Sequence, residues 1–343
     1  MYRYFFKIID VKIFFLILCV LVFSGCQTTN IERNSESKFK IGENSVNIIS
    51  GKFLQSYSDI LSSKVPERKI ITGKLYLPKA CSIQKMPAVI IQHGSGHPKI
   101  AWYKKLARVL NENGIIALVP DSMTSRGITE TSKDQSKLSK ATRLYDTFSA
   151  FRFLQEIECV EPSRIGITGY SFGGIIARDS VEKILVDKLG NGFVYKASLP
   201  VYPSCQANFK NTLPTNTKVH LLLAELDDYT PAKYCIEDSK IKKSRSWNID
   251  VTVFEGAHHG FNHEWKPKYF PNSWTFGDCG KIINDDEGYE YSQKYNVSTK
   301  DGWKKYIRRM AKNCGRKGVT MGGSKELSKR TLDFTIQFFK ENL

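Results

Sequence analysis

The segment that decides the fold is RIGITGYSFGG, which occupies residues 164–174. Residues 164–168 form an apolar run typical of a buried strand, and residues 175–185 are compatible with a helix. Glycines two residues before and two residues after Ser171 predict a sharp strand-to-helix turn that exposes the serine hydroxyl. The first amides of the following helix favour negative charge at the same point. The pattern indicates a nucleophile, but it also occurs by chance, so its interpretation depends on partners elsewhere in the chain.

A candidate acid and a candidate base follow the serine, each just after a predicted strand. Residues 219–224 form one strand, and both Asp227 and Asp228 come directly after it. Either carboxylate could orient a histidine, and either could instead cap the helix expected from Pro231. Residues 250–254 form the next strand, and His258 and His259 follow in a glycine-flanked loop. The order Ser, Asp, His is therefore complete.

A metal site is a poor alternative for these histidines. With His263 they are spaced i, i+1 and i+5, which does not place them on one helix face, and no acidic partner stands at the spacing of a metal motif. We expect neither a metal nor a cofactor.

A glycine-rich turn, His93-Gly94-Ser95-Gly96, follows the predicted strand at residues 88–92. Turns at this place supply one amide of an oxyanion hole, and the amide of the residue after the nucleophile supplies the other. We therefore predict that the backbone N–H groups of Phe172 and Ser95 bind the oxyanion, with Gly96 as the alternative to Ser95. His93 is expected to brace the turn rather than to react.

The rest of the chain alternates apolar strands with helical patterns, which predicts an α/β fold with a mostly parallel sheet covered by helices on both faces. Residues 261–324 fit this alternation poorly and are interpreted as an insertion before the C-terminal helix, which a Cys279–Cys314 disulfide would staple. The predicted strands are 73–77, 88–92, 115–119, 164–168, 195–201, 219–224 and 250–254, and the predicted helices are 101–113, 140–158, 172–188, 231–242 and 327–342.

The N-terminus has the pattern of an export signal. A short basic region precedes an apolar run at residues 13–23, which ends in Ser24-Gly25-Cys26. Residues 1–25 resemble a bacterial lipoprotein signal peptide, which implies lipid attachment at Cys26 and an anchored envelope protein. Gln27 is not the aspartate that marks inner-membrane retention, so the outer membrane, facing the periplasm, is favoured. Residues 26–45 are interpreted as a flexible tether and residues 46–343 as the folded domain. The alternative to a lipoprotein signal at residues 1–25 is a plain secretory signal or an uncleaved anchor.

Six cysteines remain beyond the signal and Cys26, which in an exported chain suggests up to three disulfides. Their connectivity does not follow from the sequence, and their wide spacing without a Cys-x-x-Cys pair disfavours zinc. The formal net charge is +17. No nucleic-acid module is present, so nucleic acid is not an expected partner. The basic stretch at residues 300–317 reads as a solvated helix face, with an anionic membrane or cell-wall surface as the alternative.

Taken together, these residues resemble the dienelactone hydrolase-like branch of the α/β-hydrolase superfamily, from about residue 70 to the C-terminus. The resemblance rests on residues 93–96, 121–122 with 126–127, the serine turn, 225–231 with Cys235, and 256–261. It implies an α/β-hydrolase fold with Asp227 as the acid, because the family acid lies four residues before the proline. It implies His259 as the base, because that histidine directly precedes Gly-Phe. A Tyr-Pro-x-Cys segment at residues 202–205 further implies a disulfide between Cys205 and Cys235.

One departure matters for the substrate. Dienelactone hydrolases use a cysteine nucleophile, whereas this chain has Ser171. We therefore expect a serine hydrolase that cleaves a carboxylic ester, in a small molecule or a polymer, through an acyl-enzyme. A peptidase or amidase on the same fold is one alternative, and a non-catalytic envelope protein that binds a ligand in a decayed cleft is another.

Overall fold

The computed structural model describes residues 39–343. The predicted signal peptide, the lipidation site at Cys26 and most of the predicted tether lie outside these residues. No helix within the described range is both long and apolar enough to cross a membrane.

The core of the fold is an eight-stranded sheet in the order β1-β2-β4-β3-β5-β6-β8-β9. The first two strands pair antiparallel, and β2 is also antiparallel to β4, whereas every pair from β4 to β9 is parallel. The predicted mostly parallel sheet is confirmed. The strands are β1 (Gly42–Gly51), β2 (Arg68–Leu77), β3 (Met86–Gln92), β4 (Ile116–Asp121), β5 (Val160–Tyr170), β6 (Ala197–Val201), β8 (Lys218–Ala224) and β9 (Ile249–Phe254).

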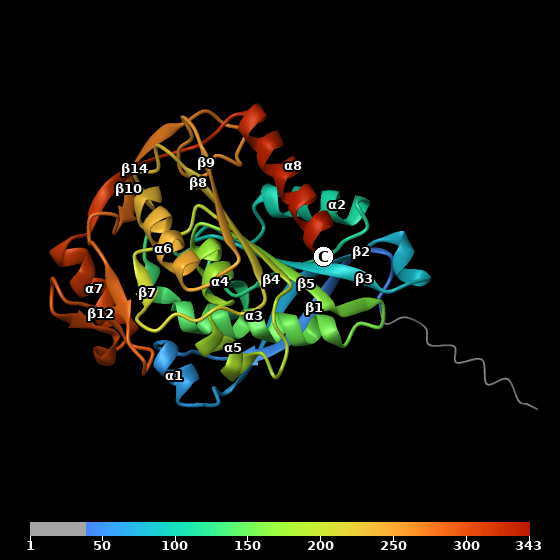
Figure 1. The fold of residues 1–343 in the computed structure, drawn as a ribbon, viewed down its shortest axis with the longest axis horizontal. Coiled ribbons are helices and arrows are strands. Elements are labelled where there is room, and N and C mark those ends of the chain that lie inside the picture. The colour runs from blue at the N-terminus through green and yellow to red at the C-terminus, as the bar shows by residue number, and fades with distance from the viewer. Residues whose placement is uncertain (1–38) are drawn as a thin grey trace, which may run out of the picture. The chain divides into compact units, whose positions relative to one another are not determined.

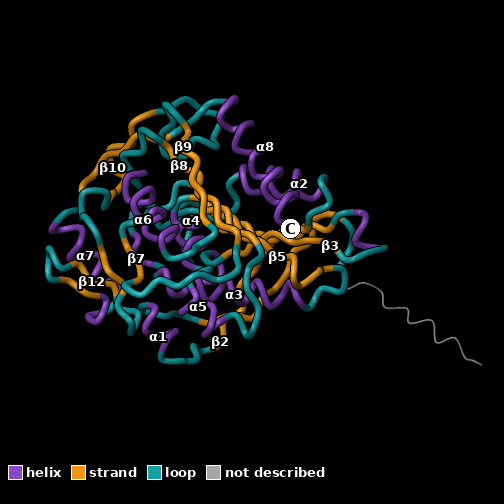
Figure 2. Tube along the Cα trace, viewed as in Figure 1, coloured by secondary structure: helices purple, strands orange, loops and turns teal. Residues whose placement is uncertain are grey.

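Helices cover both faces of this sheet (Figure 1). Helices α2 and α8 pack on one face, and α3, α4 and α6 pack on the other, as the two buried apolar clusters show. Figure 2 shows the twisted strands running between the two helical layers. The helices are α1 (Tyr57–Leu61), α2 (Ala101–Glu112), α3 (Lys140–Gln155), α4 (Phe172–Asp179), α5 (Lys183–Leu189), α6 (Ala232–Ser244), α7 (Trp303–Asn313) and α8 (Lys325–Asn342).

The central strands are apolar on both sides because both faces are covered. In β3, Ala88 and Ile90 enter the cluster beneath α3 and α4, while Val89 and Ile91 enter the cluster beneath α2 and α8. This alternation follows from the two-residue period of a strand. It explains why the sequence of a central strand is a continuous apolar run.

Strand β1 begins at Gly42, so the last four residues of the predicted tether, 42–45, belong to it. Its sequence alternates polar residues with Val46 and Ile48, and these two side chains are buried in the core. The tether was assigned from composition alone, which does not detect a one-sided edge strand. Pairing with β2 along the whole of β1 is what orders these residues.

The helix predicted over residues 172–188 is two helices, α4 and α5. The chain turns at residues 180–182, where Glu182 precedes α5 as its N-cap residue. The Glu182 carboxylate is buried and lies 2.7 Å from Nζ of Lys242 in α6. This ion pair joins residues far apart in sequence, so no local pattern indicates the break.

Residues 261–324, predicted as an insertion, contain α7 and several short strands grouped at one end of the molecule (Figure 1). Strands β10 (Lys268–Thr275) and β14 (Arg316–Met321) form an antiparallel pair. Strands β11 (Ile282–Asn284), β12 (Glu290–Ser292) and β13 (Val297–Ser298) form a second small sheet with β7 (Ala207–Phe209). The segment is therefore joined to the main domain through β7.

The six cysteines of the described chain form three disulfides, Cys81–Cys159, Cys205–Cys235 and Cys279–Cys314. The last of these spans 35 residues and links the loop after β10 to the end of α7. This disulfide closes the segment that contains β11, β12 and β13.

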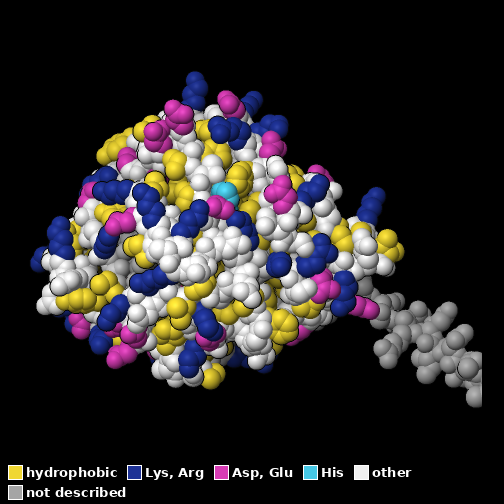
Figure 3. Space-filling view, in the orientation of Figure 1, with side chains coloured by type: hydrophobic (Ala, Val, Ile, Leu, Met, Phe, Trp, Pro, Cys, Tyr) yellow, Lys and Arg dark blue, Asp and Glu magenta, His cyan; other side chains and the backbone are white. Residues whose placement is uncertain are grey.

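Basic side chains are spread over the surface among acidic ones on the face drawn in Figure 3. Helix α7 carries the densest group: Trp303, Tyr306 and Met310 are buried on one side, and its lysines and arginines face solvent on the other. The helix therefore presents an exposed basic face.

Candidate active site

Ser171 stands between β5 and α4 in a conformation that few residues other than glycine adopt. Its φ is +56° and its ψ is −117°. Its amide donates to the Val201 carbonyl at 3.0 Å, and its carbonyl accepts from the Ile175 amide at 3.1 Å. These two bonds hold the strained turn between the sheet and the first turn of α4.

The flanking glycines are required by the close approach of backbone atoms. A Cβ atom at Gly169 would lie 2.1 Å from the Gly173 carbonyl oxygen, and a Cβ atom at Gly173 would lie 2.3 Å from the Gln92 carbonyl oxygen. Neither neighbour is a side chain that could turn away. The helix can therefore begin directly above the sheet only because both positions lack a side chain.

The structure brings Ser171, His259 and Asp227 into one hydrogen-bonded chain. His259 Nε2 lies 2.9 Å from Ser171 Oγ, and His259 Nδ1 lies 2.8 Å from Asp227 Oδ2. Asp228, the other candidate acid, accepts a hydrogen bond from the Thr320 amide at 2.9 Å instead. Of the two neighbouring carboxylates, only Asp227 therefore contacts the imidazole.

The Asp227 carboxylate is held by its own loop. Its Oδ1 accepts from the amides of Tyr229 at 2.9 Å and Thr230 at 2.7 Å, and Thr230 Oγ1 lies 3.0 Å from its Oδ2. These bonds leave Oδ2 pointing at the imidazole. Helix α6 has Pro231 as its N-cap residue and no side-chain cap, so Asp227 does not cap that helix.

His259 is 3% exposed, and aromatic rings pack on it. The ring centroids of Tyr202 and Tyr229 each lie 4.6 Å from that of the imidazole. Its carbonyl accepts from the Gly322 amide at 2.8 Å, and it forms a bridge with Met321 at the end of β14. Residues of the predicted insertion thus hold the loop that carries His259 through these two backbone contacts.

The two predicted oxyanion donors lie beside the serine. Ser95 and Phe172 line the same pocket as Ser171. Within residues 39–343, neither backbone amide donates a hydrogen bond to the protein. Both are therefore free to bind negative charge, and the Phe172 amide stands at the start of α4, where the helix dipole adds to the effect.

A residue that the sequence analysis did not single out holds both oxyanion loops. The Arg143 guanidinium of α3 is 1% exposed, donates to the carbonyls of His93 and Gly94, and lies 4.7 Å from the ring centroid of Phe172. Burial lowers the pKa of Arg143 to about 10. Burial, followed by the Arg143 charge, holds the pKa of His93 well below its usual value, so His93 is neutral. No local motif marks Arg143, because its partners lie about 50 residues away.

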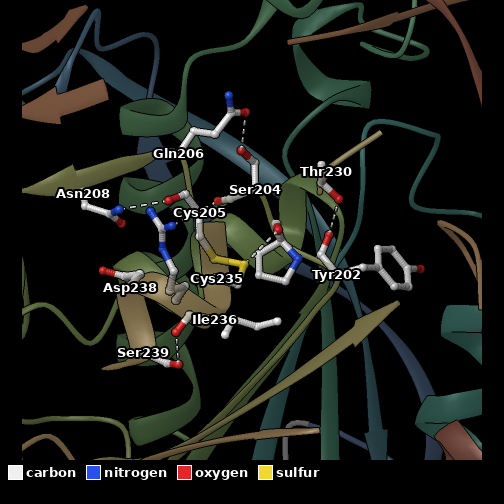
Figure 4. Close-up of a disulfide and its surroundings, with 12 residues drawn as sticks. Tyr202, Ser204, Cys205, Gln206, Asn208, Thr230, Cys235, Ile236, Asp238 and Ser239 are labelled. Atoms are coloured by element: carbon white, nitrogen blue, oxygen red, sulfur yellow. Dashed lines mark hydrogen bonds between the residues drawn. A yellow bond between two sulfur atoms is a disulfide. The ribbon is translucent and has the colours of Figure 1, made fainter. Parts of the chain in front are cut away.

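The loop between β6 and β7 is fixed to α6 by the Cys205–Cys235 disulfide (Figure 4). The Tyr202 carbonyl accepts from Thr230 Oγ1 at 3.1 Å, which joins this loop to the acid loop. Arg178 of α4 donates to the Ser204 carbonyl at 3.0 Å. The loop between β6 and β7 therefore connects α4 with the loop that carries Asp227, and the disulfide fixes it to α6.

The pocket at Ser171 has a volume of about 730 Å³, part of it open to solvent. One side comes from the main domain and the other from residues 276–310, which include α7. The lining residues are Ser95, Gln135, Lys140, Ser171, Phe172, Ile175, Ser204, Gln206, Ala207, Tyr229, Thr230, Phe276, Ile282, Glu290, Trp303, Tyr306, Ile307 and Met310.

The remaining histidines do not join this site. His263 stacks on Trp265 with ring centroids 5.2 Å apart. In the part of the chain that the structure describes, no three His, Cys, Asp or Glu side chains come together in a way that could hold a metal ion.

Replacing Gly173 with alanine tests the backbone approach. We expect Gly173→Ala to lower the free energy of unfolding by about 3 kcal/mol, the upper end of the cost of overpacking, because its Cβ would meet main-chain atoms. Gly192→Ala is the control: φ is +84° there but the space is open, so a cost of about 1 kcal/mol is expected. Urea unfolding of both variants measures the difference, and equal costs would contradict the steric argument.

Replacing Arg143 tests its contribution to the two loops. Arg143→Met leaves two buried carbonyls without their charged donor, so we expect a loss of about 2–3 kcal/mol of unfolding free energy. Arg152→Met, in the same helix, is the matched control. Arg152 is only half-buried and its bonds to Leu189 and Ser149 are longer than 3 Å, so about 1 kcal/mol or less is expected. Chemical denaturation followed by fluorescence reports both values.

Acid should destabilise the fold through three histidines. Burial lowers the pKa of His93, of His220 and of His263, the last to about 4. The unfolded chain, with histidine pKa values near 6.5, then binds more protons than the folded chain below that pH. The contribution of these histidines to the free energy of unfolding is therefore complete above pH 6.5. It decreases as the pH drops, by up to about 1.4 kcal/mol per pH unit for each histidine.

Urea midpoints at pH 7.5, 6.5 and 5.5 measure this slope. His263→Gln should reduce the slope of unfolding free energy against pH by at most the contribution of one proton, about 1.4 kcal/mol per pH unit. A stability that stays level or rises towards pH 5.5 in the unaltered chain would show that these histidines do not remain neutral in the fold.

Comparisons with known proteins agree with this architecture. A family model described as "Dienelactone hydrolase family" matches residues 71–310. The chain is 25% identical over 206 residues to the Aquifex aeolicus protein named "Putative carboxymethylenebutenolidase", covering 55% of this chain and 84% of that protein. It is 22% identical over 191 residues to "Protein usf" of Aquifex pyrophilus, covering 52% and 78%.

Among solved structures, esterase 2 of Thermogutta terrifontis aligns with a TM-score of 0.46 at 16% identity, covering 64% of this chain and 85% of that one. The family match spans residues 93–96, Ser171, Asp227, His259 and most of the segment at residues 261–324. This chain therefore belongs to the dienelactone hydrolase family.

Proposed function

We propose that this protein is a serine hydrolase that cleaves a carboxylic ester through an acyl-enzyme on Ser171. The observation that carries the proposal is the hydrogen-bonded chain Ser171–His259–Asp227 at the edge of a pocket. A buried carboxylate behind the imidazole and two unbonded amides beside the serine complete the set that acyl transfer needs. The family match supports hydrolase chemistry of this kind.

Acylation begins with attack of Ser171 Oγ on the ester carbonyl carbon. His259 Nε2 accepts the hydroxyl proton, while Asp227 holds the Nδ1–H and stabilises the imidazolium. The carbonyl oxygen becomes an oxyanion between the amides of Phe172 and Ser95. Each such donor can contribute about 3 kcal/mol to the stability of the transition state.

Acylation is complete when the carbon–oxygen bond to the alcohol breaks and His259 returns its proton to the leaving oxygen. Deacylation repeats these steps with water. A water molecule then gives a proton to His259 and attacks the acyl carbon, and Ser171 leaves with that proton. The products are one carboxylic acid and one alcohol, and the enzyme is restored.

The proposed nucleophile is Ser171 rather than a cysteine. All six cysteines in residues 39–343 are in disulfides, so no free thiol is available there to replace Ser171. The Aquifex aeolicus relative is named for the hydrolysis of a butenolide lactone. We propose a more general ester as the substrate of this chain, because its nucleophile and its pocket wall differ from those of the compact family members.

We also propose that the protein is exported and held at the outer membrane by a lipid on Cys26. Three disulfides support an oxidising compartment. Ser24 and Gly25 before Cys26, and the apolar run that precedes them, support processing as a lipoprotein. Mass spectrometry of the mature N-terminus after membrane fractionation tests both points.

The role of the triad can be tested with 4-nitrophenyl acetate. We expect Ser171→Ala to abolish hydrolysis and labelling by a fluorophosphonate probe, and Asp227→Asn to lower kcat on the order of 10⁴-fold, because the imidazole loses its orienting charge. Asp228→Asn is the matched control and should keep kcat within about twofold. Circular dichroism confirms folding, and activity in Ser171→Ala equal to that of the unaltered protein would refute the proposal.

A further inference from the structure

The wall of the pocket opposite the main domain carries polar groups that the hydrolysis mechanism does not use. Lys140, the first residue of α3, forms an ion pair with Glu290 of β12, and both side chains line the pocket. They are 9% and 7% exposed. The pair is therefore shielded from bulk water but open to the cavity.

Tyr306 lies beside this pair and has an unused hydroxyl. It projects from α7, is 2% exposed and lines the same pocket. Its hydroxyl makes no hydrogen bond of ordinary geometry among residues 39–343, and the Glu290 carboxylate lies near it. Burial, and then the Glu290 carboxylate, raise the pKa of Tyr306, so the hydroxyl stays protonated and can donate.

A second phenol has the same property closer to the serine. Tyr229, in the acid loop, also lines the pocket, and its buried hydroxyl also lacks a partner of ordinary geometry in the described chain. Buried polar groups in native proteins are almost always bonded, so two unpartnered hydroxyls on residues that line one cavity mark positions where a ligand or ordered water can supply the partner.

We propose that the pocket binds an ester with a neutral, hydroxyl-rich ring, whose hydroxyl groups bond to Tyr306, Glu290 and Lys140. This inference rests on the proposed esterase function and names the substrate class of that site. Each ligand hydroxyl can both donate and accept, so it can serve the carboxylate, the ammonium and a phenol in turn. The indole of Trp303, fixed by its bond to the Gln135 carbonyl at 2.9 Å, offers an apolar face to the ring.

The charge of the subsite favours a neutral group. A carboxylate or phosphate would pair with Lys140 but would be repelled by Glu290. An ammonium group would pair with Glu290 but would be repelled by Lys140. Because the two side chains are already paired, a charged ligand must break a shielded ion pair, whereas a hydroxyl can add to it. A wholly apolar ring would leave both phenols unbonded.

The test compares cyclohexane-sized rings that differ only in polarity, with the ring on either side of the ester bond. The alcohol arm uses methyl 6-O-acetylglucoside, cyclohexylmethyl acetate and the acetylated glucuronide of the same ring size. The acyl arm uses methyl quinate and methyl cyclohexanecarboxylate. Acid release in a pH-stat gives kcat/KM for each ester with the full mature chain.

We expect the hydroxylated ring to be preferred over both the apolar and the carboxylate-bearing ring in at least one arm. Tyr306→Phe should lower the ratio of kcat/KM for the hydroxylated over the apolar ring by roughly threefold to tenfold, the effect of one neutral hydrogen bond. Tyr269→Phe is the matched control, since Tyr269 is 63% exposed and is not a lining residue of this pocket, and it should leave the ratio unchanged.

Glu290→Gln provides a second measurement, since it keeps the size of the side chain and leaves Lys140 without its anion. We expect this variant to shift preference towards the carboxylate-bearing ring. The inference is overturned if the unaltered protein prefers the apolar or the charged ring in both arms, or if Tyr306→Phe leaves the ratio unchanged. Failure of the esterase function itself is distinct, because the protein would then hydrolyse neither these esters nor 4-nitrophenyl acetate.

Discussion

The close approach of α4 to the sheet is the constraint on which the site depends. Gly173 lies against the carbonyls of Gln92 and His93, so the first turn of the nucleophile helix touches the end of β3. Phe172 and Ser95, which follow the two segments in this contact, line the same pocket as Ser171. Arg143 bonds to the same loop and stacks on Phe172, so a buried charge holds together the two segments that the glycines allow to meet.

The segment after the histidine contributes to the site in two ways. At β14 it supports the His259 loop through a backbone bond, and the Thr320 amide holds Asp228 away from the imidazole. At α7 and β12 it forms the far wall of the pocket. In the proposed function, the main domain would supply the reacting groups, and this segment would shape the part of the pocket that selects the substrate.

Local patterns predicted the parts of the fold that depend on local interactions. The central strands were recognisable because burial on both faces makes them apolar throughout, and the helices were recognisable between them. Strand β1 was missed: residues 42–45 were assigned to the tether, and residues 46–51 were not predicted as a strand. Polar residues alternate along it, and only its pairing with β2 orders it. The break between α4 and α5 was missed because Glu182 is held by Lys242, about 60 residues later in the chain.

The sequence by itself determined the nucleophile turn, because a strained serine flanked by glycines at fixed spacing is a local requirement of the backbone. It also determined the order of serine, acid and histidine. Only the tertiary structure put Asp227 against the imidazole and Asp228 on the Thr320 amide, revealed the Cys81–Cys159 disulfide, and placed Arg143 beside residues 93–94 and Phe172. Contacts of this kind join residues that are tens of positions apart in the sequence; Ser171 and His259, for example, are separated by 88 positions. Their geometry is set by packing rather than by any local pattern.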